Sequence, residues 1–194
     1  VVINSLFSGN ESFLGGAWNN HAGSPSVTGS LFLANQAIPS TEGENGQGAA
    51  WFNRGGNFKM INCTATGNHT SGTLGAVLND PNNGAAPEII NSIISGNTIG
   101  EGSPNDADAW GFHTATIRYS ILTKNRYDGI GTPAAQPNTV VDPITGKLPD
   151  DSPAINQGDP NTNTSGYAVQ AGERDFFGNS RIKFGQIDIG ALER

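Results

Sequence analysis

The sequence is poor in the residues that build helices, disulfides and charged surfaces. Only 14% of its 194 residues are charged, and cysteine and methionine occur once each. The lone Cys63 excludes an intrachain disulfide and a cysteine-based metal site. No segment carries the i, i+3, i+4 apolar pattern of a helix, and no apolar run is long enough to predict a transmembrane span.

The few charges are mostly acidic, with 17 Asp and Glu against 10 Lys and Arg and a net charge of −7. No basic stripe is present, so we expect no nucleic acid partner. Acidity favours solubility and permits cation binding, but it specifies neither. Glycine is abundant, at 27 residues, and together with Asn, Ser and Thr it is typical of a chain that turns often.

Five segments share a short apolar pattern that ends in asparagine. The closing residues are Asn10, Asn35, Asn68, Asn97 and Asn125, at steps of 25, 33, 29 and 28 residues. Repetition at such an interval predicts a solenoid, and we expect a parallel β-helix of about five coils. A hairpin-built sandwich also needs many short strands, but it does not explain why one motif recurs with the same last residue.

In a stack of coils, identical positions lie above one another. The asparagines are therefore expected to pair amide to amide as a structural ladder. The positions that we expect to stack into one core column are Phe7, Phe32, Ile94 and Leu122. The longer steps contain polar, turn-rich insertions at 36–48, 79–88 and 98–108, which predict protruding loops that carry the residues for any partner.

A second recurring piece places Trp18, Trp51 and Trp110 at related positions after small residues. If these rings face outward, they form an aromatic ladder that binds glycans by stacking on sugar rings. If they face inward, they belong to the core, which is the favoured alternative. Neighbours such as Phe52 and Phe112 are able to take either face, so the sequence leaves both alternatives open.

The motif stops after Asn125, and residues 129–194 are expected to form an irregular C-terminal cap packed on the last coil, with the coils confined to 1–128. Three blocks of this tail, 152–159, 174–181 and 187–193, resemble the end of choice-of-anchor Q domain proteins. Asn156 departs from that family, which has Asp there. The coils are similar to polymorphic outer-membrane protein repeats. The resemblance implies a right-handed parallel β-helix of the pectin-lyase-like superfold in an exported or cell-surface bacterial protein, and it implies no activity.

Two features of the tail suggest ion binding or ion pairing. Asp159, Asn161 and Asn163 alternate oxygen ligands in the spacing that Ca²⁺ loops use, although an ordinary Asx-rich turn has the same composition. No other cofactor is expected. The residues that we expect to form a structural ion-pair network holding the tail are Asp175, Arg181, Asp188 and Glu193.

The coils carry little that suggests catalysis. Their acids do not recur at matching places in adjacent coils, and His21, His69 and His113 occupy unrelated positions. We assign no catalytic residue and expect a non-catalytic extracellular or cell-surface protein acting in adhesion, in glycan binding or as a structural element of a filament. The expected partner is a polysaccharide or another cell-surface protein, with end-to-end self-association through the Val1 edge. The alternative is a fragment of a polysaccharide lyase or glycoside hydrolase whose catalytic coils lie upstream.

Overall fold

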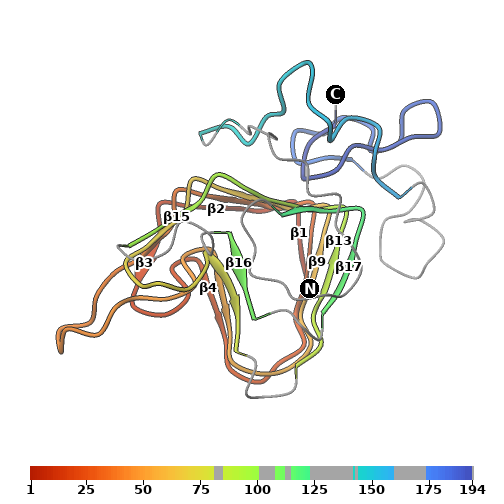
Figure 1. Cartoon of the computed structure of the whole chain (residues 1–194). Helices are drawn as coiled ribbons and strands as arrows, with labels where there is room; N and C mark the ends of the chain where they lie inside the picture. Colours follow the sequence, from red (N-terminus) through yellow and green to blue (C-terminus); the bar gives the residue numbers. More distant parts are fainter. Residues whose placement is uncertain are drawn as a thin grey trace.

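The computed structural model describes residues 1–80, 85–100, 108–111, 115–122, 142, 144–159 and 174–193. Throughout these ranges the secondary structure is short strands without any helix. All strand pairs of the four sheets are parallel, and the sheets stack as a β-solenoid of about four turns (Figure 1). This confirms the expected parallel β-helix.

Each complete coil contributes one strand to each of four sheets. The first coil consists of β1 (Val2–Ile3), β2 (Leu6–Ser8), β3 (Glu11–Ser12) and β4 (Trp18–Asn20). The second consists of β5 (Ser26–Thr28), β6 (Leu31–Leu33), β7 (Gln36–Ala37) and β8 (Trp51–Asn53). The third consists of β9 (Lys59–Ile61), β10 (Thr64–Thr66), β11 (His69–Thr70) and β12 (Val77–Asn79). The fourth consists of β13 (Glu88–Ile90), β14 (Ile93–Ile94), β15 (Thr98–Ile99) and β16 (Ala109–Trp110), and β17 (Thr116–Arg118) and β18 (Ile121–Leu122) begin a fifth.

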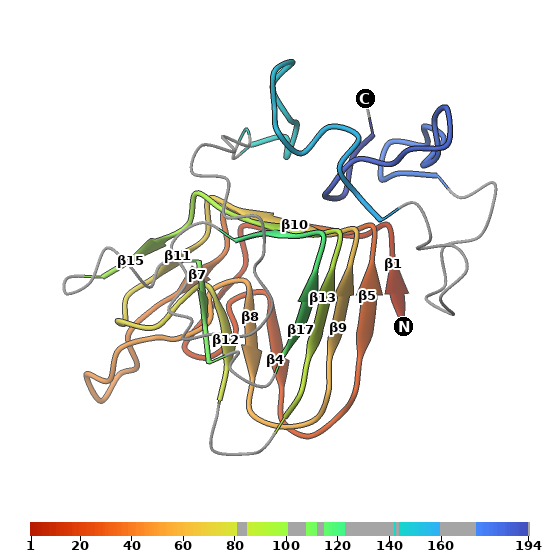
Figure 2. The ribbon, with the colours of Figure 1, turned by 45° about the vertical axis from the view of Figure 1, so that its right-hand side comes forward.

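We number the four sheets in the order in which the chain passes through them. Sheet 1 is β1-β5-β9-β13-β17, and its strands lie side by side in Figure 2. Sheet 2 is β2-β6-β10-β14-β18, sheet 3 is β3-β7-β11-β15, and sheet 4 is β4-β8-β12-β16. Because every neighbour in a sheet comes from the adjacent coil, equivalent residues of successive coils are hydrogen-bonded partners along the whole stack.

A single residue in the left-handed conformation turns the chain from sheet 1 into sheet 2 in every coil. The residues at this position are Asn4, Gly29, Asn62, Asn91 and Tyr119, with φ between 46° and 60°. Glycine and asparagine adopt this conformation more readily than other residues, which explains why every coil except the fifth has one of them at this position. An equivalent bend leads into sheet 3 at Gly9, Ala34, Gly67 and Gly96. We did not predict these bends, although they recur at the same steps as the ladder asparagines.

The interior of the solenoid is filled by side chains from the strands and the bends between them. From sheet 2 it receives Phe7, Phe32, Ala65, Ile94 and Leu122, which are in register along the stack. The rings of Phe7 and Phe32 are parallel, with centres 4.7 Å apart. This confirms the predicted core column, with alanine in the third coil.

The outer face of sheet 2 is also apolar, and the C-terminal tail covers it. In a strand, neighbours of an inward residue point to the opposite face. Leu31 and Leu33, on either side of Phe32, are buried in a cluster with Ala191 and Leu192 of the tail. Figures 1 and 2 show the described tail lying along this side of the solenoid, where it spans several coils.

The tail is bonded to coils far from the last one. The Asn4 amide of the first coil donates to the carbonyl of Arg174 at 3.2 Å. In the third coil, Thr64 Oγ1 accepts from the backbone N–H of Ala191 at 3.0 Å. In the fourth, the carbonyl of Asn91 accepts from the N–H of Gly190 at 2.8 Å.

The placement of the tail therefore differs from the expected cap on the last coil. The tail does reach the fifth coil, where Ile121 shares an apolar cluster with Leu148, Ala154 and Ile189. It also extends back to the first coil. The tail covers the apolar outer face of sheet 2 along the stack, in addition to its contact with the last coil. The predicted boundary between 128 and 129 falls in residues outside the described ranges.

Candidate functional site

The ladder asparagines pair amide to amide along the corner between sheets 2 and 3. The Nδ2 atom of Asn10 donates to Oδ1 of Asn35, that of Asn35 to Asn68, and that of Asn68 to Asn97, at 2.8, 2.8 and 2.9 Å. Each acceptor oxygen also receives the backbone N–H of the previous ladder residue, at 2.9–3.1 Å. One side chain thus satisfies two donors of the neighbouring coil, and these asparagines serve the stack rather than a ligand.

The ladder ends on a carboxylate that the sequence pattern did not reveal. Both the backbone N–H and the side-chain amide of Asn97 donate to Oδ1 of Asp108, at 3.0 and 2.8 Å. Asp108 is 1% exposed. It takes the acceptor position that we expected Asn125 to fill, and Asn125 itself lies outside the described residues.

A second amide ladder follows the strands of sheet 4. Asn20 donates to Asn53 at 2.6 Å, and Asn53 donates to Asn79 at 2.7 Å. Asn79 then donates to the carbonyl of Gly111 at 2.9 Å. The sequence shows this ladder only as a polar residue at the end of each small-then-bulky segment, so we did not predict the pairing.

The tryptophans described with their side chains belong to the core. Trp51 is 0% exposed, and its ring stacks on that of Trp18 with centres 4.8 Å apart and planes 2° apart. Phe58 stacks on the same indole, also at 4.8 Å. The proposed outward aromatic ladder is therefore not available at Trp51, because its ring faces the solenoid interior. The side chain of Trp110 lies outside the described residues.

Cys63 is a buried thiol inside the stack. Its Sγ atom donates to the carbonyls of Ile61 and Val27 at 3.3 and 3.4 Å. Burial raises the pKa of Cys63 to about 11, against the smaller lowering effect of nearby backbone N–H groups and Arg181. The thiol is thus protonated at neutral pH, as expected of a small core residue.

The sequence contains four N-glycosylation sequons, which begin at Asn10, Asn62, Asn68 and Asn163, and the first three lie within the solenoid. Asn62 and Asn68 are fully buried. The Asn10 amide is bonded within the ladder. A glycan on the side-chain nitrogen is incompatible with the burial of Asn62 and Asn68. Asn163, the fourth, lies outside the described residues.

Only one residue of the expected calcium loop is described. Asp159 is partly buried, and its backbone N–H donates to Oδ1 of Asn91 at 2.7 Å. Asn161 and Asn163 lie outside the described residues, so this loop stays a prediction. Across the part of the chain that the structure describes, no three His, Cys, Asp or Glu side chains gather as a metal site.

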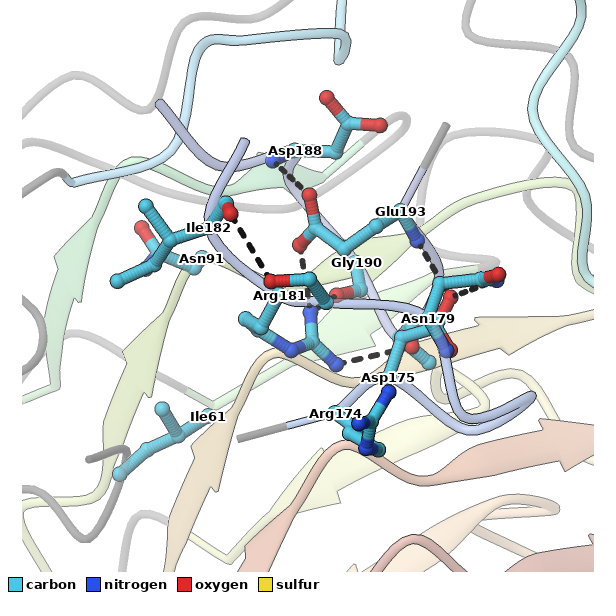
Figure 3. A network of polar contacts seen from close by, with 12 residues as sticks. Ile61, Asn91, Arg174, Asp175, Asn179, Arg181, Ile182, Asp188, Gly190 and Glu193 are labelled. Atoms are coloured by element: carbon cyan, nitrogen blue, oxygen red, sulfur yellow. Dashed lines mark hydrogen bonds and ion pairs between the residues drawn. The ribbon is translucent and has the colours of Figure 1, made fainter. Parts of the chain in front are cut away.

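A buried polar network holds the tail together, and Figure 3 shows Arg181 at its centre. Nη1 of Arg181 donates to Oε1 of Glu193 at 3.1 Å and to the carbonyl of Gly190 at 2.9 Å. Nη2 donates to the carbonyl of Ala191 at 2.9 Å. The side chains of the ion pair are each 2% exposed, so the pair is almost entirely removed from water.

Asp188 and Asp175 are linked to Glu193, the partner of Arg181, through backbone N–H groups. Asp188 N–H donates to Oε2 of Glu193 at 2.9 Å, and Glu193 N–H donates to Oδ2 of Asp175 at 3.0 Å. Burial, assisted by the nearby Asp188 charge, raises the pKa of Glu193 to about 8 despite its bonds to Arg181 and Asp188 N–H. At Asp175 burial alone would raise the pKa, but hydrogen bonds from Asn179, Glu193 and Phe177 outweigh it and lower the pKa.

On the outer face of sheet 3, exposed polar side chains lie in register on successive strands. The residues that follow the ladder asparagines form a stripe across its four strands, which we call the polar stripe: Glu11, Gln36, His69 and Thr98. All four are exposed. Nδ1 of His69 lies 2.8 Å from Oγ1 of Thr98, within hydrogen-bonding distance. The sequence signal for the stripe was present, because each member comes directly after a ladder asparagine, but we assigned no role to it.

A protruding loop lies at one end of β7. Its tip is closed by bonds from the N–H groups of Gly43 and Glu44 to the carbonyl and hydroxyl of Ser40, at 3.0 and 3.1 Å. Its return strand is tied to the third coil, where the Thr70 hydroxyl donates to the carbonyl of Gly46 at 2.7 Å. This is the first of the three predicted loops, while much of the other two lies outside the described residues.

Sheet 1 carries a different exposed arrangement. Nζ of Lys59 and Oε1 of Glu88, on neighbouring strands β9 and β13, form an ion pair at 2.8 Å. Both side chains remain partly accessible to solvent, at 38% and 22%. This pair of opposite charges on adjacent strands is a structural contact of the kind that stabilises sheets modestly.

Comparison with known protein families, with curated proteins and with solved structures found no match to this chain. The described residues also contain no helix with the length and apolar character needed to cross a bilayer. The class that fold and site define is thus an all-β parallel solenoid with a laterally docked tail.

Proposed function

We propose that the protein is a non-catalytic surface protein that binds a polysaccharide along the outer face of sheet 3. The observation that carries this proposal is the polar stripe, in which four exposed hydrogen-bonding side chains lie in register on successive coils. A chain of sugars parallel to the solenoid axis meets one stripe residue per coil, at intervals of about 4.8 Å.

The chemistry of the stripe suits hydroxyl-rich ligands. Glu11 supplies a carboxylate, Gln36 an amide that donates and accepts, and His69 and Thr98 further groups of both kinds. The backbone beneath is fixed by sheet pairing and by the asparagine ladder directly beside it. A rigid row of donors and acceptors loses little conformational entropy on binding, which favours recognition of an extended polymer.

The resemblance to choice-of-anchor Q domain proteins supports the cell-surface part of the proposal. In that setting a solenoid presents a long side to the surroundings and acts in adhesion or as a structural element of a surface assembly. The described charges support the non-catalytic part. Of the described bases, Lys59 pairs with Glu88 and Arg181 pairs with Glu193 in the buried tail network, so these two have structural partners.

The proposal is tested by affinity electrophoresis and calorimetry of the whole chain with soluble pectin, alginate, chondroitin and neutral glucans. The variant Gln36→Ala/His69→Ala removes the centre of the stripe, and we expect a loss of about tenfold or more in affinity for the bound polymer. The control is Lys59→Gln/Glu88→Gln on sheet 1, which changes exposed polar residues away from sheet 3 and should leave the affinity unchanged.

Equal binding by the stripe variant and the parent protein would refute the role of sheet 3. Absence of binding to every polymer would refute glycan recognition among these ligands. The same incubations are assayed for unsaturated uronates and new reducing ends. Steady product formation would favour the lyase or hydrolase alternative over a non-catalytic protein.

A further inference from the structure

The tail presents an aromatic side chain at the tip of a tight hairpin. Lys183 and Gln186 pair as antiparallel neighbours, each donating its N–H to the other's carbonyl at 3.0 Å. Phe184 and Gly185 between them both have positive φ, 53° and 78°. Two-residue hairpin turns of this kind favour Asn-Gly and Asp-Gly, so phenylalanine at the first position is unusual. Its side chain is fully exposed, at 104%.

Phe184 gives the folded chain no stability that asparagine would not give. An L-residue in the left-handed conformation is strained, because its Cβ approaches the following carbonyl oxygen. Burial of the ring would offset that cost, but the ring buries no surface within this chain. Strained positions that folding does not require are typical of ligand contacts. The ring is therefore expected to contact something outside the chain.

The exposed charges of segment 174–193, which contains the hairpin, are positive although the whole chain is acidic. The acids of segment 174–193 are all buried: Asp175, Asp188 and Glu193. Of its bases only Arg181 is buried, while Arg174 is exposed and Lys183 is partly exposed next to Phe184. This segment thus presents cations and hydrogen-bonding groups, but no carboxylate, to its surroundings.

A second exposed ring of the same segment also has a cation beside it. Phe177, on the turn at 175–179, is 54% exposed. Nζ of Lys147 lies 5.7 Å from the centre of its ring. Exposed phenylalanine with neighbouring lysine is the composition of surfaces that sit at the boundary of a lipid bilayer. The lysine heads remain among the headgroups while the rings enter the apolar layer.

We propose that the hairpin tip, Lys183-Phe184-Gly185, inserts into the headgroup region of an anionic lipid bilayer as a peripheral contact. A bilayer accepts a single ring without a shaped pocket, and its negative surface attracts Lys183. The N–H and carbonyl groups of Lys183 and Gln186 are already paired with each other, so the backbone groups that meet the polar headgroups are those of the two turn residues. This surface shares no residue with the polar stripe, so the two proposals are tested separately.

The test measures co-sedimentation of the whole chain with large unilamellar vesicles of phosphatidylcholine, with and without phosphatidylglycerol. We expect binding that requires the anionic lipid, and a reduction of about tenfold or more in partitioning for Phe184→Asn. Because asparagine suits the turn, the same variant should retain or raise the melting temperature, which separates lost binding from lost folding. Lys183→Gln should weaken binding to phosphatidylglycerol vesicles and make the remaining binding less sensitive to salt than that of the parent protein.

A matched control comes from the solenoid. Tyr119 is also an exposed aromatic residue with positive φ, at 50% and 48°, so Tyr119→Asn makes the same chemical change at another place. It should leave vesicle binding unchanged. Equal binding of Phe184→Asn and parent protein would overturn the proposal, as would equal binding to neutral and anionic vesicles. Phe184-dependent retention by an anionic polysaccharide without any vesicle binding would instead assign the tip to a glycan.

Discussion

The solenoid and its tail are stabilised in contrasting ways. In the solenoid the ladder contacts are repeated from coil to coil, so Asn35 and Asn68 make the same bonds one coil apart. In the tail each contact occurs once, and the pair of Arg181 and Glu193 has no equivalent elsewhere in the described residues. A repeated structure distributes the consequence of a change over neighbouring coils, whereas a single buried ion pair concentrates it.

Removal of Arg181, the centre of the tail network, should have the largest effect on stability. Arg181→Met leaves Glu193 and the carbonyls of Gly190 and Ala191 buried without their donor. We expect the free energy of unfolding to fall by about 3–5 kcal/mol, because three buried acceptors each lose a hydrogen bond. Urea unfolding followed by circular dichroism measures the loss, and a dye that binds apolar surface reports exposure of Leu31 and Leu33.

The control for Arg181→Met is Lys59→Met, which removes the cation of the exposed pair on sheet 1. Its effect should stay below about 1 kcal/mol. If both variants unfolded at the same urea concentration as the parent, the tail would not be held by its buried pair. Loss of strand signal together with the tail would show that the solenoid depends on its lateral cover.

The same network makes stability depend on pH. Because the folded-state pKa of Glu193 is about 8, above its ordinary value of 4.5, the folded chain holds a proton that the unfolded chain has released between these values. The contribution of Glu193 to the free energy of unfolding is therefore fully present below pH 4.5. It falls as the pH rises towards 8, by up to about 1.4 kcal/mol per pH unit.

Unfolding measured from pH 5 to 8 tests this sign. Glu193→Gln should flatten the slope over that window, because the amide does not titrate. Glu88→Gln, in the exposed pair on sheet 1, should leave the slope as it is. A parent protein whose stability rose from pH 5 to 8 would contradict the raised pKa of Glu193.

Within the asparagine ladder, the burial of each asparagine should decide how much stability is lost when it is replaced. Asn68→Ala leaves two donors of Asn35 unpaired in a fully buried place, and we expect a loss of about 3 kcal/mol. Asn10→Ala removes the exposed first rung and should cost less than about 1 kcal/mol. Thermal unfolding of the two variants makes the comparison, and equal losses would show that burial does not set the strength of a rung.

The sequence indicated the solenoid better than it indicated the tail, for physical reasons. Recurring residues such as Asn35 and Asn68 are visible as a pattern, because every coil needs the same bonds. The side placement of the tail was encoded in Leu31-Phe32-Leu33, where both faces of a strand are apolar and both need cover. A tail that covers the side of a sheet makes each contact once, so it produces no repeating pattern in the sequence. The orientation of Trp51 was ambiguous for another reason, because Phe52 beside it is equally apolar.

The smallest expected effect concerns Tyr119, which is neither Asn nor Gly although it lies at the left-handed bend between sheets 1 and 2. Tyr119 adopts φ 48° at the position held elsewhere by asparagine or glycine, and its ring is half exposed. Tyr119→Asn should therefore stabilise the chain by up to about 1 kcal/mol, since it relieves backbone strain and sacrifices little burial. Thermal unfolding beside Asn62→Tyr, the reverse change in a fully buried rung, tests the argument. Stabilisation by the first change together with strong destabilisation by the second would show that backbone conformation selects the residue at this bend, and that burial under the tail decides how strictly it does so.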